Sequence, residues 1–394
     1  MTWRGRTDVI MPLSRHCKQF ALGLTLTIGV FVVVLLNTDN NNNIDTTSSR
    51  YTLLRGRLKA LGNYSINNQS KTPITWKTLG KLLPDDVTFM SYPKEHNTCF
   101  PSQIWKGINH DNKSHRYSSC GRVFYNRVPK CGSRTVLSVF KALSGPNNFS
   151  LYSYIRPAGR GYFRSIQKLI NFGMNFSQLP DSFLYSQHLH FVNFTQLDIP
   201  PPVYINVIRD PVERAISHFY YNKYGSGNLM KKPSHSLSLE QCVSQLGTCH
   251  YLPLNVILPY FCGHPKPCRS GSPDALQRAK RTLRQSFLVV GLTENLPAFM
   301  DLLQVLMPNL FSNATYVFNQ IGKCSKNLQD QMINKTQTNK KPPVPFHTVS
   351  TLKDILADEY DFYNFAKQRF YEQYNKVFKT AVVGETDLRI IQPD

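Results

Sequence analysis

The chain has 394 residues and carries 46 lysines and arginines against 24 aspartates and glutamates, a formal net charge of +22. Solvated lysines account for many such excesses, but a charge this large also attracts polyanions and makes their binding salt-dependent. Nucleic acids and acidic glycans both meet that description, and the compartment indicated by the N-terminal region argues against nucleic acid.

An apolar segment at residues 20–36 contains no charged side chain and would span about 25 Å as a helix at ~1.5 Å per residue. This length suits a thin early-secretory membrane. Four cations precede the segment: Arg4, Arg6, Arg15 and Lys18. The positive-inside rule then leaves residues 1–19 in the cytosol and the remainder in the lumen. A cleaved signal peptide is the alternative, but no small-x-small cleavage site follows, so we expect a membrane anchor.

The region after the anchor has the features of a luminal protein. Residues 37–115 are rich in Asn, Ser and Thr and are expected to form a stem, and 116–394 can form one α/β domain. Nine cysteines fit an oxidising compartment. Eight N-x-[ST] sequons predict glycosylation sites on the surface. They are Asn63, Asn68, Asn112, Asn148, Asn175, Asn193, Asn313 and Asn334.

The first chemically informative segment follows a strand predicted at 123–128. Pro129 ends that strand, and apolar residues at helical spacing predict a helix from about Ser133. Free N–H groups at a helix N-terminus, with a glycine for close approach and hydroxyl and cationic side chains nearby, describe a phosphate or sulfate seat. The residues of this seat are Lys130, Cys131, Gly132, Ser133, Arg134 and Thr135. The Walker spacing is absent, and an ordinary strand–helix turn is the alternative.

A second strand–helix junction strengthens that interpretation. Residues 203–208 predict a buried parallel strand, and Pro211 stands at the first position of a helix with a capping box from Asp210 and Glu213. Arg209 and Ser217 can meet one phosphate there, since an arginine fork suits bidentate contact. An ion pair of Arg209 with Asp210 or Glu213 is the structural alternative.

Two further elements complete the expected domain. A third strand at 287–292 leads through Thr293 into a helix that runs to about Phe311. One long amphipathic helix is expected at 352–378, with an apolar face that core packing explains.

These segments resemble the Golgi glycosaminoglycan 2-O-sulfotransferases, the family of the uronyl and heparan sulfate enzymes and of Pipe-like proteins. The seat at 130–135 resembles their 5′-phosphosulfate loop, and Arg209 with Ser217 their 3′-phosphate motif. The segments 126–135, 188–194 and 259–263 carry the closer similarity. The resemblance covers roughly residues 120–378 and depends on several motifs.

The resemblance implies a P-loop-like sulfotransferase fold, with a mainly parallel sheet flanked by helices. It implies transfer of a sulfuryl group from 3′-phosphoadenosine 5′-phosphosulfate to the 2-hydroxyl of a uronic acid in chondroitin or dermatan sulfate, without a metal. His188 matches the family's catalytic base, and Lys130 would stabilise the leaving group. Ser325 and Lys340 lie in a segment that resembles the loop closing over the nucleotide.

The histidine pattern leaves one question open. The heparan sulfate enzymes have a second histidine two residues before the base, where this chain has Ser186, while His190 follows two residues after it. On a strand His188 and His190 would share a face, but across an irregular loop they need not. His190 is expected to contact substrate or to be structural. Cys131 replaces a threonine of the heparan enzymes.

Further expectations come from the same resemblance. Cys242 with Cys249 and Cys262 with Cys268 match two short-loop disulfides of the family, whereas the pairing of Cys99, Cys120, Cys131 and Cys324 is left open. A type II Golgi membrane enzyme and a homotrimer are implied. The alternatives are a heparan sulfate or Pipe-like acceptor, and an inactive luminal glycan-binding protein. A P-loop kinase is disfavoured by the missing Walker lysine and magnesium motif.

Overall fold

The computed structural model describes residues 99–106, 120–154, 161–224, 237–246, 249, 252–265, 267–270, 272–321 and 342–378. They all fall within one compact unit, Asn67–Asp394. Within these residues we find no helix with the length and apolar character needed to traverse a membrane. The predicted cytosolic tail at 1–19, the anchor at 20–36 and most of the stem at 37–115 lie outside the described residues.

Five parallel strands form the centre of the domain in the order β2-β3-β1-β4-β5. Their bounds are β1 Arg122–Asn126, β2 Ser150–Ser153, β3 Phe183–Gln187, β4 Val203–Ile208 and β5 Phe287–Leu292. Every residue of β3, β4 and β5 is buried, as expected for parallel strands covered on both faces. The sheet confirms the α/β class, and β4 and β5 have the predicted bounds.

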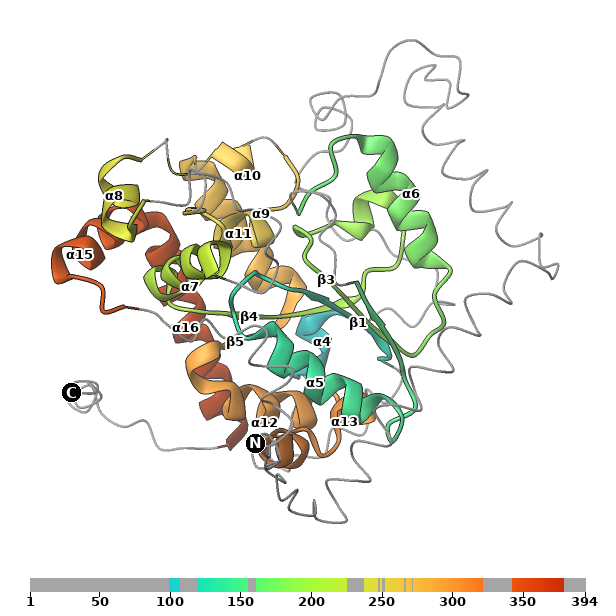
Figure 1. The fold of residues 1–394 in the computed structure, drawn as a ribbon. Helices are drawn as coiled ribbons and strands as arrows, with labels where there is room; N and C mark the ends of the chain where they lie inside the picture. The colour runs from blue at the N-terminus through green and yellow to red at the C-terminus, as the bar shows by residue number, and fades with distance from the viewer. Residues whose placement is uncertain are drawn as a thin grey trace, which may run out of the picture. The chain divides into compact units, whose positions relative to one another are not determined.

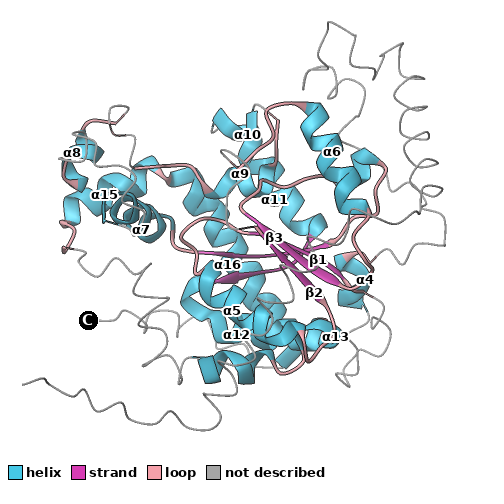
Figure 2. Cartoon of the chain, turned by 45° about the vertical axis from the view of Figure 1, so that its right-hand side comes forward, coloured by secondary structure: helices cyan, strands magenta, loops and turns pink. Residues whose placement is uncertain are grey.

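Helices cover both faces of this sheet (Figures 1 and 2). One face carries α5 (Ser133–Ser144), α12 (Leu296–Leu306) and α13 (Pro308–Phe311). The opposite face carries α6 (Ile166–Ser177), α9 (Ile257–Cys262) and α11 (Pro273–Ser286). The other helices are α4 (Pro101–Lys106), α7 (Pro211–Tyr224), α8 (Leu239–Ser244), α10 (Pro267–Ser270), α15 (Phe346–Ile355) and α16 (Ala357–Phe378).

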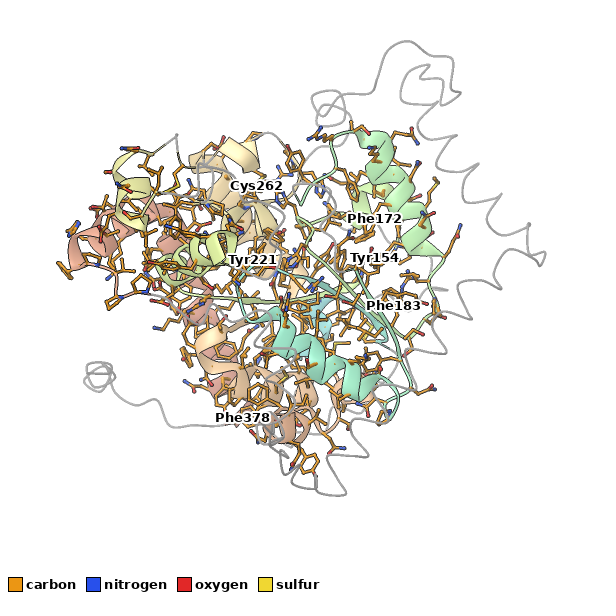
Figure 3. The ribbon with its side chains drawn as sticks, in the orientation of Figure 1. Tyr154, Phe172, Phe183, Tyr221, Cys262 and Phe378 are labelled. Carbon is orange, nitrogen blue, oxygen red and sulfur yellow. A yellow bond between two sulfur atoms is a disulfide. The ribbon has the colours of Figure 1, made fainter. Side chains whose placement is uncertain are left out.

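Aromatic side chains fill the space between the sheet and α6. Phe124 of β1 stacks on Phe176 of α6 and on Tyr204 of β4, with ring centroids 5.6 and 5.1 Å apart. Figure 3 shows Phe172 and Phe183 in the same layer, and both have ring contacts with Phe176. Such pairs add to area burial, so this layer fixes β1 against its neighbours.

The prediction of one long C-terminal helix at 352–378 is wrong in one respect, because the helix is interrupted at Leu356. α15 ends at Ile355 and α16 begins at Ala357. Leu352 and Leu356 belong to a core cluster with α7 and α8, whereas α16 packs against β5 and α11. Because the apolar faces of α15 and α16 pack against different elements, the two helices cannot continue as one straight helix. Similarly, the helix expected to reach Phe311 breaks before Pro308, which starts α13.

Disulfides link peripheral segments of the domain. The structure contains both predicted short-loop disulfides, Cys242–Cys249 and Cys262–Cys268, and a third one, Cys99–Cys120, that the sequence left unassigned. Cys99–Cys120 ties α4 to the start of β1, and Trp105 of α4 donates its indole N–H to the Leu288 carbonyl at 3.0 Å. Part of the segment assigned to the stem therefore packs on the catalytic domain.

Candidate active site

The carboxyl ends of the parallel strands meet at one edge of the sheet, and the chain direction changes there. β1 is central; the chain continues from it toward β2 and β3 on one side and returns to β4 on the other. In open α/β sheets, ligands bind in the crevice at such a switch point. The loop after β1, His188 after β3, Arg209 after β4 and Thr293 after β5 all lie at this edge.

The loop after β1 is the first wall of the candidate site. Its backbone adopts left-handed conformations at Lys130 and Gly132, both with φ of 68°. Glycine allows this without strain, and a Cβ at position 132 would lie 3.4 Å from the Thr293 side chain. The loop therefore lies tightly against the junction that follows β5.

Helix α5 begins directly after this loop, at the predicted Ser133. Its N-cap, Gly132, supplies no side-chain hydrogen bond, and no acidic residue occupies its first turn. The N–H groups of the first turn and the positive end of the helix dipole are thus left for an anion. Left-handed residues two positions apart, Lys130 and Gly132, turn the backbone before the helix, as in the concave backbones that bind phosphate and sulfate.

Lys130 connects this first wall with the second. Its ammonium lies 4.0 Å from the centre of the Tyr221 ring on α7, a cation–π contact (Figure 3 labels Tyr221). The lysine of the first strand–helix junction thus reaches the helix of the second junction. The two segments predicted separately from the sequence therefore lie next to each other.

The junction after β4 provides the second wall. Asp210 accepts a hydrogen bond from the Glu213 N–H at 2.9 Å, so half of the predicted capping box is present. The other half is absent, because the Asp210 N–H donates to Glu294 and the Glu213 carboxylate pairs with Arg209 at 2.8 Å. Ser217 lies two turns into α7 and is buried.

The Arg209–Glu213 ion pair is the structural alternative considered for Arg209, and its strength decides its importance. The side chains are 23% and 56% exposed, and the pair is an i,i+4 contact on a helix start. Such pairs stabilise a protein by roughly 0.3–0.5 kcal/mol, whereas a charge-assisted bond to phosphate contributes about 1.5–3 kcal/mol. The ion pair therefore does not prevent Arg209 from binding an anion.

His188 follows the last residue of β3 and is half-buried. Its Nδ1 lies 2.8 Å from the Arg127 carbonyl oxygen. Because a carbonyl only accepts, Nδ1 carries the proton and Nε2 is left unprotonated in the neutral ring. Burial, followed by the positive charge of Arg127 and that of Arg134, lowers the pKa of His188 from 6.5 to about 4. His188 is therefore a neutral imidazole with one lone pair to accept a proton.

His190 has a different environment because β3 ends at Gln187 and the following segment is irregular. Its N–H donates to the Gly161 carbonyl at 2.7 Å. Its buried ring packs against Tyr260, Tyr162 and His264, with centroids 5.0, 5.7 and 6.0 Å away. These contacts favour the structural role among the two considered for His190.

One ionisable pair at this site was missed by the sequence argument. Arg214 of α7 is fully buried; it donates to the Pro253 carbonyl at 2.7 Å and to Nδ1 of His218 at 3.2 Å. Burial, then the positive charges of Arg214 and Lys130, lower the pKa of His218 to about 3, and His188 also contributes. The i,i+4 spacing of Arg214 and His218 beside Ser217 was the available signal.

The remaining predicted site residues divide into three groups. Cys131 has a fully buried side chain, and burial raises its thiol pKa to about 12, so only its backbone can line the site. Arg134 is exposed, whereas Ser133 and Thr135 are half-buried at the α5 N-terminus. Ser325 and Lys340 lie outside the described residues. Among the described residues, no cluster of His, Cys, Asp and Glu is arranged to hold a metal ion.

Four predicted glycosylation sequons lie in the described part of the chain. Asn148, Asn175 and Asn313 are exposed, and Asn193 is half-buried with its side-chain oxygen accepting a hydrogen bond from Thr195. The other four, Asn63, Asn68, Asn112 and Asn334, lie outside the described residues.

Comparison with known proteins places the chain among sulfotransferases. Residues 116–251 match the sulfotransferase family. The chain is 32% identical to human uronyl 2-sulfotransferase over 280 residues, which are 68% of this chain and 67% of that protein. It is 30% identical to the Drosophila melanogaster uronyl 2-sulfotransferase homolog pip over 302 residues, 70% of this chain but only 57% of that protein. It is 32% identical to Xenopus laevis heparan sulfate 2-O-sulfotransferase 1 over 258 residues, which are 63% of this chain and 70% of that protein.

Proposed function

Because the chain belongs to the sulfotransferase family, we propose that it transfers a sulfuryl group from 3′-phosphoadenosine 5′-phosphosulfate to the 2-hydroxyl of a uronic acid in chondroitin or dermatan sulfate. The observation that carries the proposal is the convergence of two anion-binding junctions with a neutral histidine. The loop after β1, the start of α7 and His188 all lie at the carboxyl edge of one sheet.

The residues fit a donor with two separate anionic groups. The uncapped α5 N-terminus and the left-handed loop at Lys130 and Gly132 suit the 5′-phosphosulfate. Arg209 and Ser217, on the neighbouring junction, suit the 3′-phosphate. The donor supplies an activated sulfuryl group, and the protein contributes position and positive charge around it.

His188 acts as the general base in this proposal. Its Nε2 accepts the proton of the acceptor hydroxyl as that oxygen bonds to the sulfur and the bridging oxygen–sulfur bond of the donor breaks. The Arg127 carbonyl holds the Nδ1–H, which fixes the ring orientation and the tautomer. Arg127 itself is held by a bond to the Tyr154 carbonyl at 2.6 Å.

Lys130 neutralises the negative charge that develops on the leaving phosphate oxygen. In the structure the Lys130 ammonium lies over the Tyr221 ring, beside the loop from which it comes. A cation–π contact contributes roughly 0.5–2 kcal/mol, so a bond to a phosphate oxygen can replace it.

The cellular setting is proposed on the same footing. Three disulfides in the described residues suit an oxidising compartment, and the apolar segment at 20–36 suits a type II Golgi anchor with a luminal catalytic domain. A homotrimer follows from the family resemblance alone. The uncharged Nε2 of His188 and the intact anion junctions argue against an inactive glycan-binding protein.

A heparan sulfate or Pipe-like acceptor is the second candidate. The Xenopus laevis relative named for heparan sulfate is as similar in identity, at 32%, as the human relative named for uronyl transfer. The described side chains suit both acceptors, and the following experiment distinguishes them.

The test is incubation of the purified protein with radiolabelled donor and separate desulfated chondroitin, dermatan and heparan chains, followed by disaccharide analysis. We expect label at the 2-position of a uronic acid in chondroitin or dermatan. Label in heparan alone would transfer the assignment to the second candidate. Absence of transfer to every acceptor, with glycan binding intact and donor binding lost, would leave a glycan-binding protein.

His188→Ala gives the matched test of mechanism. It should lower turnover at saturating substrate by about 10²-fold or more and leave affinity for 3′-phosphoadenosine 5′-phosphate nearly unchanged. His190→Ala is the control, because that ring belongs to a packed aromatic cluster. Near-normal turnover in His188→Ala, beside an inactive His190→Ala enzyme that still binds nucleotide, would assign the base to His190.

A further inference from the structure

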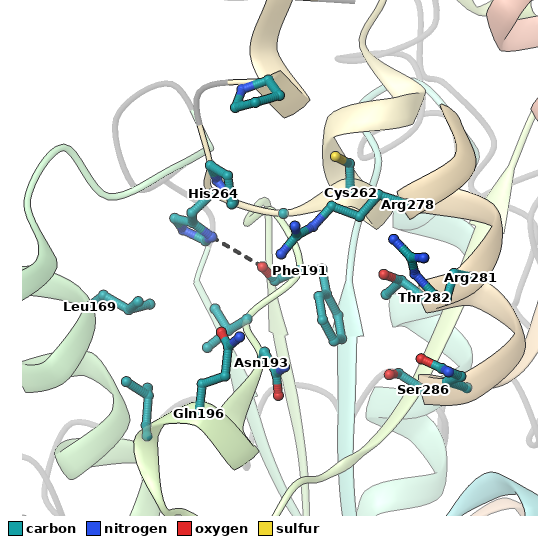
Figure 4. A pocket seen from close by; sticks show the side chains of 16 residues that line it. Leu169, Phe191, Asn193, Gln196, Cys262, His264, Arg278, Arg281, Thr282 and Ser286 are labelled. Carbon is teal, nitrogen blue, oxygen red and sulfur yellow. Dashed lines mark hydrogen bonds between the residues drawn. The ribbon is translucent and has the colours of Figure 1, made fainter. Parts of the chain in front are cut away.

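A cavity of about 320 Å³ lies away from the nucleotide site (Figure 4). It is bounded by α6, by residues 191–197, by the loop that contains the Cys262–Cys268 disulfide, and by α11. Of the predicted nucleotide-binding residues that the structure describes, none lines it. Its volume is within the range of small-molecule sites, about 300–1,000 Å³.

The chemistry of this cavity is cationic and rich in hydrogen-bonding side chains. Arg278 and Arg281 are one turn apart on α11 and face Asn193 and Gln196 from the opposite wall (Figure 4). Thr282, Gln285 and Ser286 add hydroxyl and amide groups. Among the described residues that line the cavity, none is an aspartate or a glutamate. Two guanidinium groups with neutral donors and acceptors suit a carboxylated or sulfated sugar ring.

The positive charge of α11 is divided between two faces. Lys280 pairs with Asp361 of α16 at 2.8 Å, and the Arg284 guanidinium lies 4.7 Å from the centre of the Phe365 ring. These two cations contact α16. Arg278 and Arg281 are on the other face of the helix, where they line the cavity.

The walls of the cavity are held in place before any ligand arrives. The Cys262–Cys268 disulfide closes one side, and His264 lies on that side with its Nδ1 donating to the Phe191 carbonyl at 3.1 Å (Figure 4). His264 also stacks on Phe163, with ring centroids 5.3 Å apart. A preformed wall lowers the entropy cost of binding.

The cavity is also connected to the proposed base through a short stretch of chain. His188 and Asn193 are five residues apart, and an extended chain spans at most ~3.6 Å per residue, so they lie within about 18 Å of each other. An oligosaccharide of a few units can bridge that distance. One polymer chain can therefore reach both places.

We propose that this cavity binds an anionic sugar unit of the glycosaminoglycan chain at a position remote from the reacting uronic acid. The proposal rests on the proposed function for the identity of the polymer. It makes the enzyme prefer long acceptors over short ones, because a long chain gains a second point of attachment.

Two variants with a matched control test the assignment. Arg281→Gln removes one cavity-facing charge, and Arg284→Gln removes the same charge from the α16-facing side of α11; both arginines are exposed. Gln285→Trp fills the cavity without changing the net charge. Binding of a chondroitin sulfate decasaccharide is measured by calorimetry with 3′-phosphoadenosine 5′-phosphate saturating.

Arg281→Gln should weaken decasaccharide binding by roughly tenfold, as expected for one lost charge-assisted contact. Gln285→Trp should weaken it by a similar factor, because the indole occupies the space of the sugar. Arg284→Gln should weaken it by less than about twofold. All three variants should retain the wild-type KM for the shortest oligosaccharide that the enzyme sulfates. Equal effects of Arg281→Gln and Arg284→Gln, or unchanged binding in Gln285→Trp, would refute the cavity assignment.

The outcomes separate this proposal from the function on which it rests. Wild-type transfer with no advantage for long acceptors removes the cavity assignment and keeps the transferase. Decasaccharide binding that depends on Arg281, without transfer to any acceptor, keeps the cavity and removes the transferase. A glycan on Asn193 would occupy the same space, so glycopeptide mapping that finds Asn193 fully modified in active protein would also overturn the proposal.

Discussion

Acidification should destabilise this protein through two histidines that the fold keeps neutral. The pKa of His188 is lowered from 6.5 to about 4 and that of His218 to about 3, in both cases first by burial and then by neighbouring cations. In the unfolded chain both rings regain the ordinary pKa and bind protons as the pH falls below it. The unfolded state then binds more protons than the folded state, so stability is lost as the pH falls.

The magnitude follows from the two pKa values. Between pH 7 and pH 5 an unfolded histidine goes from about one quarter protonated to nearly fully protonated, while the folded ring gains almost no proton. Each histidine therefore contributes a loss of about 2 kcal/mol, or roughly 4 kcal/mol for the pair. Because native domains are stable by only about 5–15 kcal/mol, this loss is a large fraction of the total.

Urea unfolding at pH 7 and pH 5, with disulfides intact, measures the effect in wild-type protein and in His218→Asn. Asparagine places its amide oxygen where Nδ1 accepts from Arg214, so the contact is retained while the titrating group is removed. The stability lost between the two pH values should be about 2 kcal/mol smaller in the variant. His347→Asn, at an exposed histidine of α15, is the control. An equal loss in wild type and His218→Asn would refute the reasoning.

Three further predictions concern the nucleotide site. Arg209→Ala should weaken binding of 3′-phosphoadenosine 5′-phosphate by roughly tenfold or more. Glu213→Gln should change that affinity by less than about threefold, because the ion pair that it removes is weak. Unchanged affinity in folded Arg209→Ala protein would contradict the assignment of Arg209. The acid limb of kcat/KM for the donor, which reports the donor-free enzyme, should fall near pH 4, since His188 is deprotonated above that value. A midpoint near pH 6.5 in that profile would exclude it as the base. Cys131 should resist maleimide at pH 8 until the protein unfolds, because burial raises its thiol pKa to about 12; labelling of native protein, read by peptide mapping, would place the thiol in solvent.

The sequence predicted best those elements whose local signal agrees with their tertiary surroundings. β4 and β5 are continuous apolar runs, and the structure buries every residue of both. The helix starts at Ser133 and Pro211 were also predicted, because a glycine or a proline marks each boundary. These two starts position both anion junctions, which is why much of the candidate site was visible before the structure.

Other features depended on contacts that one segment cannot reveal. β2 is a four-residue edge strand with exposed ends, and its sequence does not predict a strand. The break at Leu356 separates two amphipathic helices with different partners, and their apolar residues read as one stripe. The divergence of His188 from His190 depends on where β3 ends, and the depressed pKa values depend on cations from other elements.

In the proposed function, the cations of this site have a second effect beyond binding the donor. A donor with a 5′-phosphosulfate and a 3′-phosphate requires several positive groups close together, and we propose that Lys130, Arg209 and the α5 N-terminus provide them. Cations near the base, including Arg127 and Arg134 near His188, necessarily disfavour its protonated form. The same electrostatics that attract an anionic donor therefore keep the imidazole deprotonated before the reaction. An anion bound in the site offsets part of this positive charge and moves the pKa of the imidazole back toward its ordinary value, which makes it a stronger base when the donor is present.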